Sequence, residues 1–454
     1  MQTQEKSNSD LILRDLGDDL ILRRSTAKDA EALAEFNAVI HAEPDIANDG
    51  LRVAAWVRDL LTTQHPTFGS GDFTIVEDSR TGQIISSLNL ISQTWSYAGI
   101  EFGVGRPELV GTLPEYRNRG LVRAQFDVVH GWSAERGELV QAITGIPYYY
   151  RLFGYEMALN LGGGRTGFLP QIPKLKEGET EPYRIRPARA EDLAFISDLY
   201  RNYCRRSLVS CVWGEAEWRY HLERMSAENV NRFELRIVET TTGEPAGCLA
   251  HAHFNWNRGW MFPVVFFEVM PGTSWAAVTP SVIRYMQATG EAQSSRDGQE
   301  PFGAFHFALG EKHPVYDVLT TRLPRLRKPY AWYLRVADLP GFLLRIAPAL
   351  EKRLEASAYS GHSGELKVTF YRSGIRIAIE RGRLATIEPW APMPQGHSGD
   401  AAFPELTFLQ LVFGYRSFEE LKNAFPDCWY ENDDAFGLLN ALFPRQVSDL
   451  WPIA

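Results

Sequence analysis

The segment Glu108–Val122, with the sequence ELVGTLPEYRNRGLV, carries the pattern that decides the fold. Its first half, Glu108–Pro114, is a short apolar run closed by a proline, which predicts a strand. The apolar residues that follow fall on one face of a helix, at Leu121, Ala124, Val128 and Trp132. The segment therefore predicts a strand, a basic turn that contains glycine, and a helix N-terminus.

This turn suits the binding of a pyrophosphate group. Backbone N–H groups at a helix N-terminus have no partner inside the helix, and the helix dipole adds partial positive charge there. Gly120 lets the backbone approach phosphates without a Cβ in the way, and Arg117, Arg119 and Arg123 add charge-assisted hydrogen bonds. A surface turn with solvated arginines explains the same residues, so the turn alone does not decide the function.

A second element stands at Pro147–Tyr155, with the sequence PYYYRLFGY, after a predicted strand at Leu139–Thr144. It resembles the (F/Y)-Y-x-x-x-G-(F/Y) element that follows the fifth strand of GNAT-type N-acetyltransferases. Alignment of Gly154 and Tyr155 with the end of that element places Tyr150 on the tyrosine position. The turn and this element occur in the family's order and spacing, so the two together indicate an α/β acetyltransferase domain.

The resemblance implies both a donor and a mechanism. In the family, the pantetheine arm of acetyl-CoA pairs with backbone groups of the fourth strand, here expected at Val110 and Thr112. The pyrophosphate is expected on the turn, at Arg117, Asn118, Arg119, Gly120, Leu121, Val122 and Arg123. A deprotonated amine attacks the thioester directly in a ternary complex, and Tyr150 protonates the leaving thiolate. Ordinary aromatic packing is the other interpretation of the run Tyr148–Tyr150.

An internal similarity organises the first two thirds of the chain. Leu22–Ala30 (LRRSTAKDA) resembles Ile185–Leu193 (IRPARAEDL), and each segment predicts a strand that leads into a helix. Thr26 is expected to cap the first helix, with Asp29 at the capping-box spacing. The similarity favours a duplication, although strand–cap–helix junctions also converge on such patterns.

We expect three domains: residues 12–165, a catalytic GNAT domain; 183–335, a second GNAT domain; and 336–454, an α+β domain. The polar run Pro170–Pro182 is typical of a linker between the first two. Near Ser281–Gly290, where the repeat places the pyrophosphate turn, no basic glycine loop occurs, so the second copy is expected to be non-catalytic. The expected fold class is α/β (α+β), with mixed central sheets in the two tandem domains.

The layout resembles the Eis (enhanced intracellular survival) group, in which a sterol-carrier-protein-like domain follows two GNAT domains. The segments that carry the resemblance are Pro114–Leu121, Tyr150–Tyr155 and Leu406–Leu421. In that group the chain's C-terminal carboxylate reaches the active site, and Ala454 holds that position here; a frayed terminus is the alternative. The group also implies a homo-oligomer, a hexamer, and a primary amine acceptor such as an aminoglycoside, a polyamine or lysine.

Two departures from the family are visible. Val122 stands where ordinary GNAT domains carry glycine or alanine, which fits the Eis branch better than the general motif. The sequence ends in DLWPIA, without the aromatic terminus associated with Eis. For the acceptor, Glu43 and Asp45 are carboxylates that would suit an ammonium group, or are simply solvated loop residues.

Composition excludes several other classes. The net charge of −9, from 47 basic and 56 acidic residues, argues against nucleic-acid binding and is compatible with a cationic substrate. The four cysteines form no CxxC pair, and His251 and His253 are expected to be structural, so no metal is expected. No signal peptide is apparent and no run approaches about 18 apolar residues, so a cytoplasmic protein without a membrane span is expected.

Three functions remain open at this point. The first is acetyl-CoA-dependent N-acetylation of a small primary amine. The second is the same reaction on a protein lysine. The third is a non-catalytic protein that binds CoA or a lipid through the sterol-carrier-like domain. The turn and Tyr150 together favour catalysis in the first domain, whereas the acceptor amine is not identified by the sequence.

Overall fold

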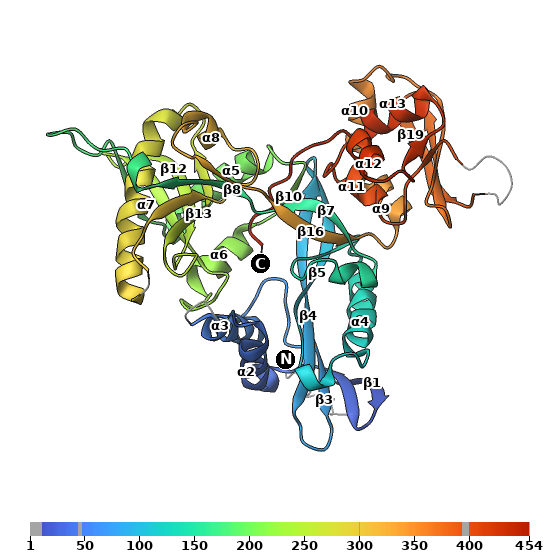
Figure 1. The fold of residues 1–454 in the computed structure, drawn as a ribbon, viewed down its shortest axis with the longest axis horizontal. Helices are drawn as coiled ribbons and strands as arrows, with labels where there is room; N and C mark the ends of the chain where they lie inside the picture. The colour runs from blue at the N-terminus through green and yellow to red at the C-terminus, as the bar shows by residue number, and fades with distance from the viewer. Residues whose placement is uncertain (1–10, 44–47, 299, 393–398, 454) are drawn as a thin grey trace.

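The computed structural model describes residues 11–43, 48–298, 300–392 and 399–453. In this part of the chain the strands form three sheets, of nine, seven and five strands (Figure 1). The first two sheets face each other across the C-terminal segment, and the third lies to one side with its own helices (Figure 1). Among the described residues, no helix is long and apolar enough to cross a membrane.

The first sheet has the order β1-β2-β3-β4-β5-β6-β16-β7. The short strand β10 pairs with the last three residues of β4, Trp95–Tyr97. Its strands are β1 (Ile12–Gly17), β2 (Leu20–Arg24), β3 (Phe73–Asp78), β4 (Ile84–Tyr97), β5 (Ile100–Thr112), β6 (Val140–Ile143), β16 (Tyr330–Arg335), β7 (Glu156–Leu161) and β10 (Val209–Cys211).

Helices cover both faces of the first sheet. The helix α4 (Leu121–Glu135) packs on one face, and α2 (Ala30–His41) and α3 (Asp49–Thr62) lie on the other (Figure 1). The short 3₁₀ turns are η1 (Ala27–Asp29), η2 (Pro114–Tyr116) and η3 (Tyr149–Phe153). Both α4 and β6 begin within one residue of the positions expected from the sequence, whereas β5 begins eight residues before Glu108, as one arm of a long hairpin with β4.

The second sheet has the order β15-β8-β14-β13-β12-β11-β9. Its strands are β15 (Arg325–Arg327), β8 (Gly164–Phe168), β14 (Ala304–Phe307), β13 (Met261–Val269), β12 (Pro245–Ala252), β11 (Phe233–Thr240) and β9 (Tyr183–Pro187). Its helices are α5 (Leu193–Cys204), α6 (Glu215–Glu223), α7 (Trp275–Asp297) and α8 (Pro314–Val318), with the 3₁₀ turns η4 (Leu169–Gln171) and η5 (Ala190–Asp192).

The two sheets exchange a strand. The chain leaves the first sheet after β7 and enters the second as β8, which pairs antiparallel with β14. Later β16 returns to the first sheet, where it lies between β6 and β7 and pairs antiparallel with both. The strand β8 occupies the same place beside β14 in the second sheet. Residues 330–335, expected in the second domain, therefore complete the first sheet.

The repeated sequence forms the same polar cluster twice. Arg23 pairs with Asp29 at 2.7 Å and with Glu77 at 2.5 Å. Its counterpart Arg186 pairs with Asp192 at 2.7 Å and with Glu239 at 2.8 Å. The capping box expected at Thr26 and Asp29 is confirmed, because Thr26 N donates to Asp29 Oδ2 at 2.7 Å and the Thr26 hydroxyl accepts from Lys28 N. Each triad fixes the start of the first helix on the strands beside it.

The third sheet has the order β19-β18-β17-β20-β21. Its strands are β19 (Arg383–Trp390), β18 (Gly374–Glu380), β17 (Gly364–Thr369), β20 (Ala401–Ala402) and β21 (Trp429–Tyr430). Its helices are α9 (Leu339–Arg345), α10 (Ala347–Glu355), α11 (Phe408–Val412), α12 (Phe418–Ala424) and α13 (Asp433–Leu442). The apolar alternation at Ile375–Ile379 lies within β18, which pairs antiparallel with its neighbours as expected.

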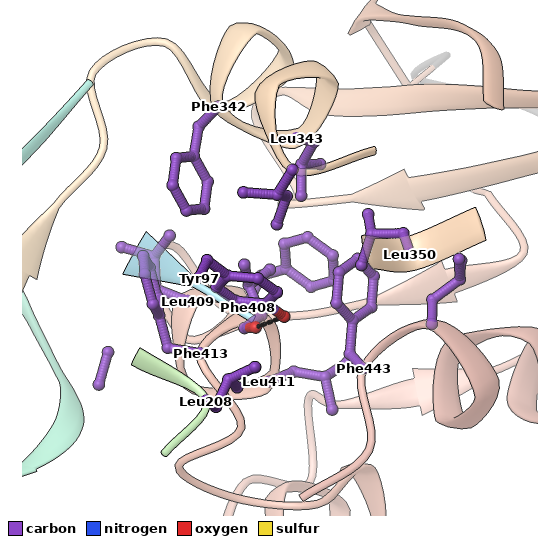
Figure 2. Close-up of a cluster of buried hydrophobic side chains, with 14 of the residues drawn as sticks. Tyr97, Leu208, Phe342, Leu343, Leu350, Phe408, Leu409, Leu411, Phe413 and Phe443 are labelled. Atoms are coloured by element: carbon purple, nitrogen blue, oxygen red, sulfur yellow. Dashed lines mark hydrogen bonds between the residues drawn. The ribbon is translucent and has the colours of Figure 1, made fainter. Parts of the chain in front are cut away.

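The β4–β5 hairpin inserts its tip into the third part of the chain. Figure 2 shows Tyr97 of β4 and Leu208, which precedes β10, among the apolar side chains of the C-terminal helices. The Tyr97 hydroxyl donates to the Val412 carbonyl at 2.8 Å and accepts from Arg353 Nη1 at 2.9 Å. The ring of Phe342 lies 6.3 Å from that of Tyr97 and 5.2 Å from that of Phe413. This aromatic contact joins the first and third sheets through one continuous core.

We predict that Phe342→Ala strongly destabilises the protein. Phe342 is fully buried on α9, and removal of a buried phenylalanine ring costs about 3–5 kcal/mol. Leu344→Ala is the matched control, because Leu344 lies on the same helix and is 46% exposed, so we expect a change within about 0.5 kcal/mol. Urea denaturation followed by intrinsic fluorescence gives the midpoints. Equal midpoints for the two variants would contradict the role assigned to Phe342.

Candidate active site

The strands β5 and β6 lie side by side for only two residue pairs and then diverge. They pair in parallel at Val104–Val140 and Gly105–Gln141. Beyond Gly105, β5 continues to Thr112, and no described strand pairs with this part of β5 on the β6 side. An extended molecule can therefore lie along β5 there and pair with its backbone groups.

A β-bulge in β5 lies within the diverging part. Glu108 faces Asn89 of β4 and Gly111 faces Ser87, so β5 has one extra residue between these two pairs. Leu109 takes a φ of 54°, a conformation that is uncommon for a residue with a side chain. Bulges bend a strand locally, which accounts for the direction that β5 takes away from β6.

The turn that follows β5 leaves the N-terminus of α4 open. Gly120 is the N-cap residue with a φ of 77°, and no side chain accepts a hydrogen bond from the first N–H groups of the helix. A Cβ at Gly120 would meet no atom within 4 Å, so the glycine is required by its backbone conformation and not by space. Free N–H groups and the helix dipole make this end a favourable place for an anion.

A buried polar network holds α4 on the sheet. Gln125 of α4 donates from Nε2 to the Ser86 hydroxyl at 2.7 Å and accepts from the Thr74 hydroxyl at 2.9 Å. The Ser86 hydroxyl in turn donates to the Gly111 carbonyl at 2.7 Å and contacts the Thr112 hydroxyl at 2.7 Å. The network links β3, β4, β5 and α4, so the helix N-terminus is fixed relative to the bulge.

The three arginines of the turn are exposed around the α4 N-terminus. Arg119 donates to Asp18 at 2.7 Å, Arg117 Nε approaches the Thr112 carbonyl at 3.4 Å, and Arg123 Nη1 approaches the Leu152 carbonyl at 3.4 Å. Asn118 takes a φ of 62° between the first two arginines. The residues that the sequence predicts to bind acetyl-CoA, from Val110 to Arg123, thus lie at the end of β5, in the turn after it and at the start of α4.

Tyr150 lies in η3, which follows β6, and is only 4% exposed. Its ring contacts Phe126 of α4 at 6.1 Å and Tyr333 at 5.5 Å. A Cβ at Gly145 would lie 3.6 Å from the Tyr150 hydroxyl, so the hydroxyl lies beside the backbone that leaves β6. Burial raises the pKa of Tyr150, and the nearby Glu108 raises it further, so the phenol is protonated at neutral pH.

Sequence reasoning missed an ion pair beside this tyrosine. Arg106 and Glu108 of β5 form it, with Arg106 fully buried and the Glu108 side chain 15% exposed. Burial raises the pKa of Glu108, and Arg106 opposes that rise. Among the described residues, Nε and Nη1 of Arg106 have no hydrogen-bond partner, and its guanidinium lies 4.7 Å from the ring of Trp332. No local pattern marks these two residues in the sequence.

The exchanged strand β16 contributes side chains both to the surroundings of Tyr150 and to those of the Arg106–Glu108 ion pair. Tyr333 packs on Tyr150, and the Tyr333 hydroxyl accepts a hydrogen bond from Tyr148 N. Trp332, on the opposite face of β16, packs against Arg106 and against Trp95 of β4. The site therefore includes residues from β5, η3 and a strand that begins about 180 residues after Tyr150.

The C-terminal segment runs between the first two sheets (Figure 1). Leu208 N donates to the Val447 carbonyl at 3.1 Å, and the Tyr200 hydroxyl donates to the Trp451 carbonyl at 2.7 Å. The Trp451 ring stacks on Phe266 at 4.8 Å. Gln93 Nε2 of β4 approaches the Ile453 carbonyl at 3.4 Å. The last described residue, Ile453, therefore contacts β4 at Gln93. Gln93 lies four residues after Asn89 on the same face of the strand, a distance of about 13 Å along it.

Two of the sequence-predicted residues, Ala454 and Asp45, lie outside the described residues. Glu43 donates its backbone N–H to Asp49 at 2.8 Å. His251 and His253, on β12 and just after it, have ring nitrogens hydrogen-bonded to backbone carbonyls at 2.8 Å and 2.9 Å. Burial lowers the pKa of His251 to about 4.

Comparison with known proteins agrees with this geometry. Residues 23–158 match the family model described as an acetyltransferase (GNAT) domain. A search of curated proteins found no match. The first domain is therefore a GNAT acetyltransferase domain, and the match covers the turn and Tyr150.

Solved structures show that the likeness in fold extends over nearly the whole chain. A GCN5-related N-acetyltransferase from Kribbella flavida is 17% identical, with a TM-score of 0.61, and the alignment covers 96% of this chain and 100% of that one. A conserved protein of unknown function from Enterococcus faecalis V583, titled "Probable N-Acyltransferase", is 16% identical, with a TM-score of 0.61 and coverage of 94% and 97%. Eis1 from Mycobacterium abscessus is 13% identical, with a TM-score of 0.58 and coverage of 95% and 98%.

The fold and the family match together define the class of this domain. It is an acetyltransferase domain of the GNAT type, within a chain of mixed α/β architecture. This class transfers an acyl group from an acyl-CoA donor to an acceptor substrate.

Asp449 in the C-terminal segment provides a prediction that depends on pH. Burial raises the pKa of Asp449 to about 6, while the Tyr203 hydroxyl and Arg206 oppose the rise. The folded state thus holds this proton more tightly than the unfolded state, and the stability it contributes is lost as the pH rises from about 4 through 6. We expect Asp449→Asn, which keeps an oxygen for Tyr203, to gain stability relative to the wild type over this range and to level off above pH 7. Urea midpoints of both proteins at pH 4.5 and pH 7.5 test this, and a difference independent of pH would contradict it.

Proposed function

We propose that this protein transfers the acetyl group of acetyl-CoA to a primary amine by direct attack in a ternary complex, with Tyr150 as the proton donor. The observation that carries the proposal is the position of Tyr150, a buried and protonated phenol at the opening between β5 and β6. The open N-terminus of α4 lies at the other end of the same opening, where β5 ends.

The residues of the first domain fit an acetyl-CoA donor. Val110 and Thr112 lie on the part of β5 that no described strand covers on the β6 side, which suits the amides of a pantetheine arm. The pyrophosphate would lie against the α4 N-terminus, with Arg117, Arg119 and Arg123 around it. Bound acetyl-CoA would supply the thioester that the amine attacks.

The high pKa of Tyr150 defines how it acts. A thiol has a reference pKa of about 8.5 and a phenol about 10, and burial raises the value for Tyr150 further. Full proton transfer to the free thiolate is therefore unfavourable by itself, even after the C–S bond has broken. Tyr150 donates a hydrogen bond that strengthens as negative charge develops on sulfur, and release of the protonated thiol, CoA, draws the proton transfer to completion.

The acceptor ammonium group must lose a proton before its nitrogen can attack the thioester, and a carboxylate near the opening can accept that proton. Glu108 is the carboxylate beside Tyr150, and its partner Arg106 holds it on β5. The carboxylate of Ala454 is the alternative, because the neighbouring residue Ile453 lies on the same face of β4 as Asn89, the cross-strand neighbour of Glu108. The two assignments predict different effects of mutation.

The finer resemblance to the Eis group is part of this proposal. It includes a catalytic domain at 12–165, a second domain without catalytic function at 183–335, and a sterol-carrier-protein-like domain at 336–454. It also includes a cytoplasmic homo-oligomer, a hexamer, and an aminoglycoside, polyamine or lysine side chain as the acceptor. The extended likeness in fold to Eis1 supports the arrangement of the three parts. A thiol-release assay with acetyl-CoA and a panel of these amines and of lysine peptides tests the acceptor.

We predict that Tyr150→Phe lowers kcat by about 10²-fold or more, because loss of a positioned proton donor typically costs this much. The affinity for acetyl-CoA should change little, since the ring and its packing remain. Tyr149→Phe is the matched control, with a hydroxyl on the neighbouring residue of η3, and should keep its kcat. Thiol release measures kcat and calorimetry measures donor affinity. Full turnover by Tyr150→Phe would remove this tyrosine from the mechanism.

We predict that Glu108→Gln lowers kcat by about 10²-fold and removes the dependence of kcat on the ionisation of this carboxyl in the acidic pH range. Burial raises the pKa of Glu108, so the rate of the wild type rises as the pH increases and the carboxyl loses its proton. Glu101→Gln, an exposed change on the same strand, is the control. Normal turnover by Glu108→Gln with loss of turnover on deletion of Ala454 would assign the role to the terminus.

A further inference from the structure

The second sheet has an opening that parallels the one in the first. The strands β13 and β14 pair in parallel from Met261–Ala304 to Val264–Phe307. Beyond this, β13 continues to Val269, and the chain after β14 turns away to α8, as the chain after β6 turns to η3. The exchanged strand β8 flanks β14 as β16 flanks β6.

The chemistry of this second opening differs from acyl transfer. The hydroxyl of Tyr316 on α8 donates to the carbonyls of Phe307 at 3.1 Å and Gly310 at 3.2 Å, so it is committed to the backbone. The N-terminus of α7 is capped by Ser274, whose hydroxyl accepts from Ala277 N at 3.3 Å. Neither a free phenol nor an open helix end is therefore present at the positions that serve the first opening.

Two adjacent cavities lie beside the chain between β14 and α8, of about 890 Å³ and 560 Å³. They share Arg206, Ser207, Lys312 and Val447 in their walls. Each cavity has the volume that binds a small molecule in other proteins, typically 300–1,000 Å³. We call the two cavities together the basic cleft.

The lining of the basic cleft is cationic in a chain whose net charge is −9. Its basic side chains are Arg165, Arg201, Arg205, Arg206, Lys312 and Arg445, and its acidic ones are Glu101, Glu311, Asp317 and Asp449. The buried Asp449 accepts a hydrogen bond from Tyr203, and Glu311 lies 3.7 Å from Arg445. Glu101 and Asp317 are exposed.

Three of the basic groups are available for a ligand. Arg165 stacks on the ring of Tyr316 at 5.2 Å, and its buried Nε has no hydrogen-bond partner among the described residues. Within the same part of the chain, Lys312 and Arg205 have no carboxylate within ion-pair distance, and Arg205 contacts only the side-chain oxygen of Asn202 at 3.2 Å. Of the described residues that line the larger cavity, five are basic and one, Glu101, is acidic, and such a surplus of guanidinium and ammonium groups favours an anion with several oxygens.

We propose that the basic cleft is a second ligand site, which binds an anion through its phosphate groups. Arg165 presents a guanidinium held in place by Tyr316, and Lys312 adds a mobile ammonium at the point where the two cavities meet. Phosphate matches this set because it offers several oxygens to one planar fork and one point charge. The site is independent of the proposed acetyl transfer in the first domain.

The position of the basic cleft links the ligand to the C-terminal segment. Val447 lines both cavities, and Asp449 lines one of them beside Tyr203. The same segment continues through Trp451 to Ile453, which lies on β4 of the first sheet. An anion in the cleft would therefore stabilise the segment that contacts Gln93 on β4 of the first sheet.

Calorimetry with inorganic pyrophosphate, in the presence of saturating CoA, tests the proposal on the full chain. CoA occupies the donor site, so the expected result is one remaining binding event that weakens at high ionic strength. Arg165→Gln and Lys312→Gln should each weaken it at least tenfold, whereas Lys174→Gln, an exposed change outside the cleft, should leave it unchanged. Circular dichroism and unchanged CoA affinity establish that the variants are folded.

The remaining arms separate the sources of phosphate. Tighter binding of ATP than of pyrophosphate assigns the site to a nucleotide, and equal binding assigns it to the phosphate groups alone. The proposal is overturned if both variants bind pyrophosphate as the wild type does, or if citrate binds more tightly than either phosphate compound. Failure of acetyl transfer in the first domain would leave each of these results interpretable.

Discussion

The reciprocal exchange of β8 and β16 is the constraint on which the rest of the molecule depends. Each sheet uses a strand from the other half of the chain, and each exchanged strand pairs with the last parallel strand of its host sheet. Backbone hydrogen bonds across these pairs are lost if the two halves separate, so the halves are held in one arrangement. Two side chains of β16 also complete the site, since Tyr333 packs on Tyr150 and Trp332 packs on Arg106. The geometry of Tyr150, the proposed proton donor, is therefore set in part by β16, which precedes the third sheet in the chain.

The parts of this site that the sequence predicts are those decided by local rules. The turn at Arg117–Gly120, the helix that begins at Leu121 and the capping box at Thr26 each depend on residues within a few positions of one another. The pairing of β16 with β6 and the contact of Gln93 with Ile453 depend on residues that are far apart in the chain. Strand periodicity does not identify the partner of a strand, so the position of residues 330–335 between β6 and β7 could not be predicted from the sequence. Glu108 was assigned correctly to a strand, but its role depends on the bulge at Leu109 and on the buried Arg106, which a single sequence does not reveal.

Burial raises the pKa of both Tyr150 and Glu108 at the opening, but it favours the proposed role of the first and opposes that of the second. It keeps Tyr150 protonated, which a hydrogen-bond donor requires, and it raises the pKa of Glu108, which opposes the charged form that a base requires. Arg106 opposes this rise in the pKa of Glu108, because it places a positive charge beside the carboxylate in a region of low dielectric constant. The cost is a buried guanidinium with two unpaired nitrogens, and each such group costs about 1–3 kcal/mol without a partner. Residues that lower the stability of the fold in this way cluster at functional sites, and Arg106 lies at the end of the β5–β6 pairing.

The two halves of the chain differ in structure at their helix ends. In the first half a glycine N-cap leaves the N–H groups of α4 open, and exposed arginines surround them. In the second half Ser274 accepts a hydrogen bond from an N–H group of α7. The basic side chains of this half lie instead on β8, at the end of α5 and in the loop before α8. The triads at Arg23 and Arg186 remain alike, because they fix strands and helices that both halves need. What differs is the set of residues near the diverging strands, which are not part of the packing that both halves share. The C-terminal segment passes over the second opening and ends beside the first, so a ligand bound in one half can act on the other through a physical connection and not only through the shared sheets.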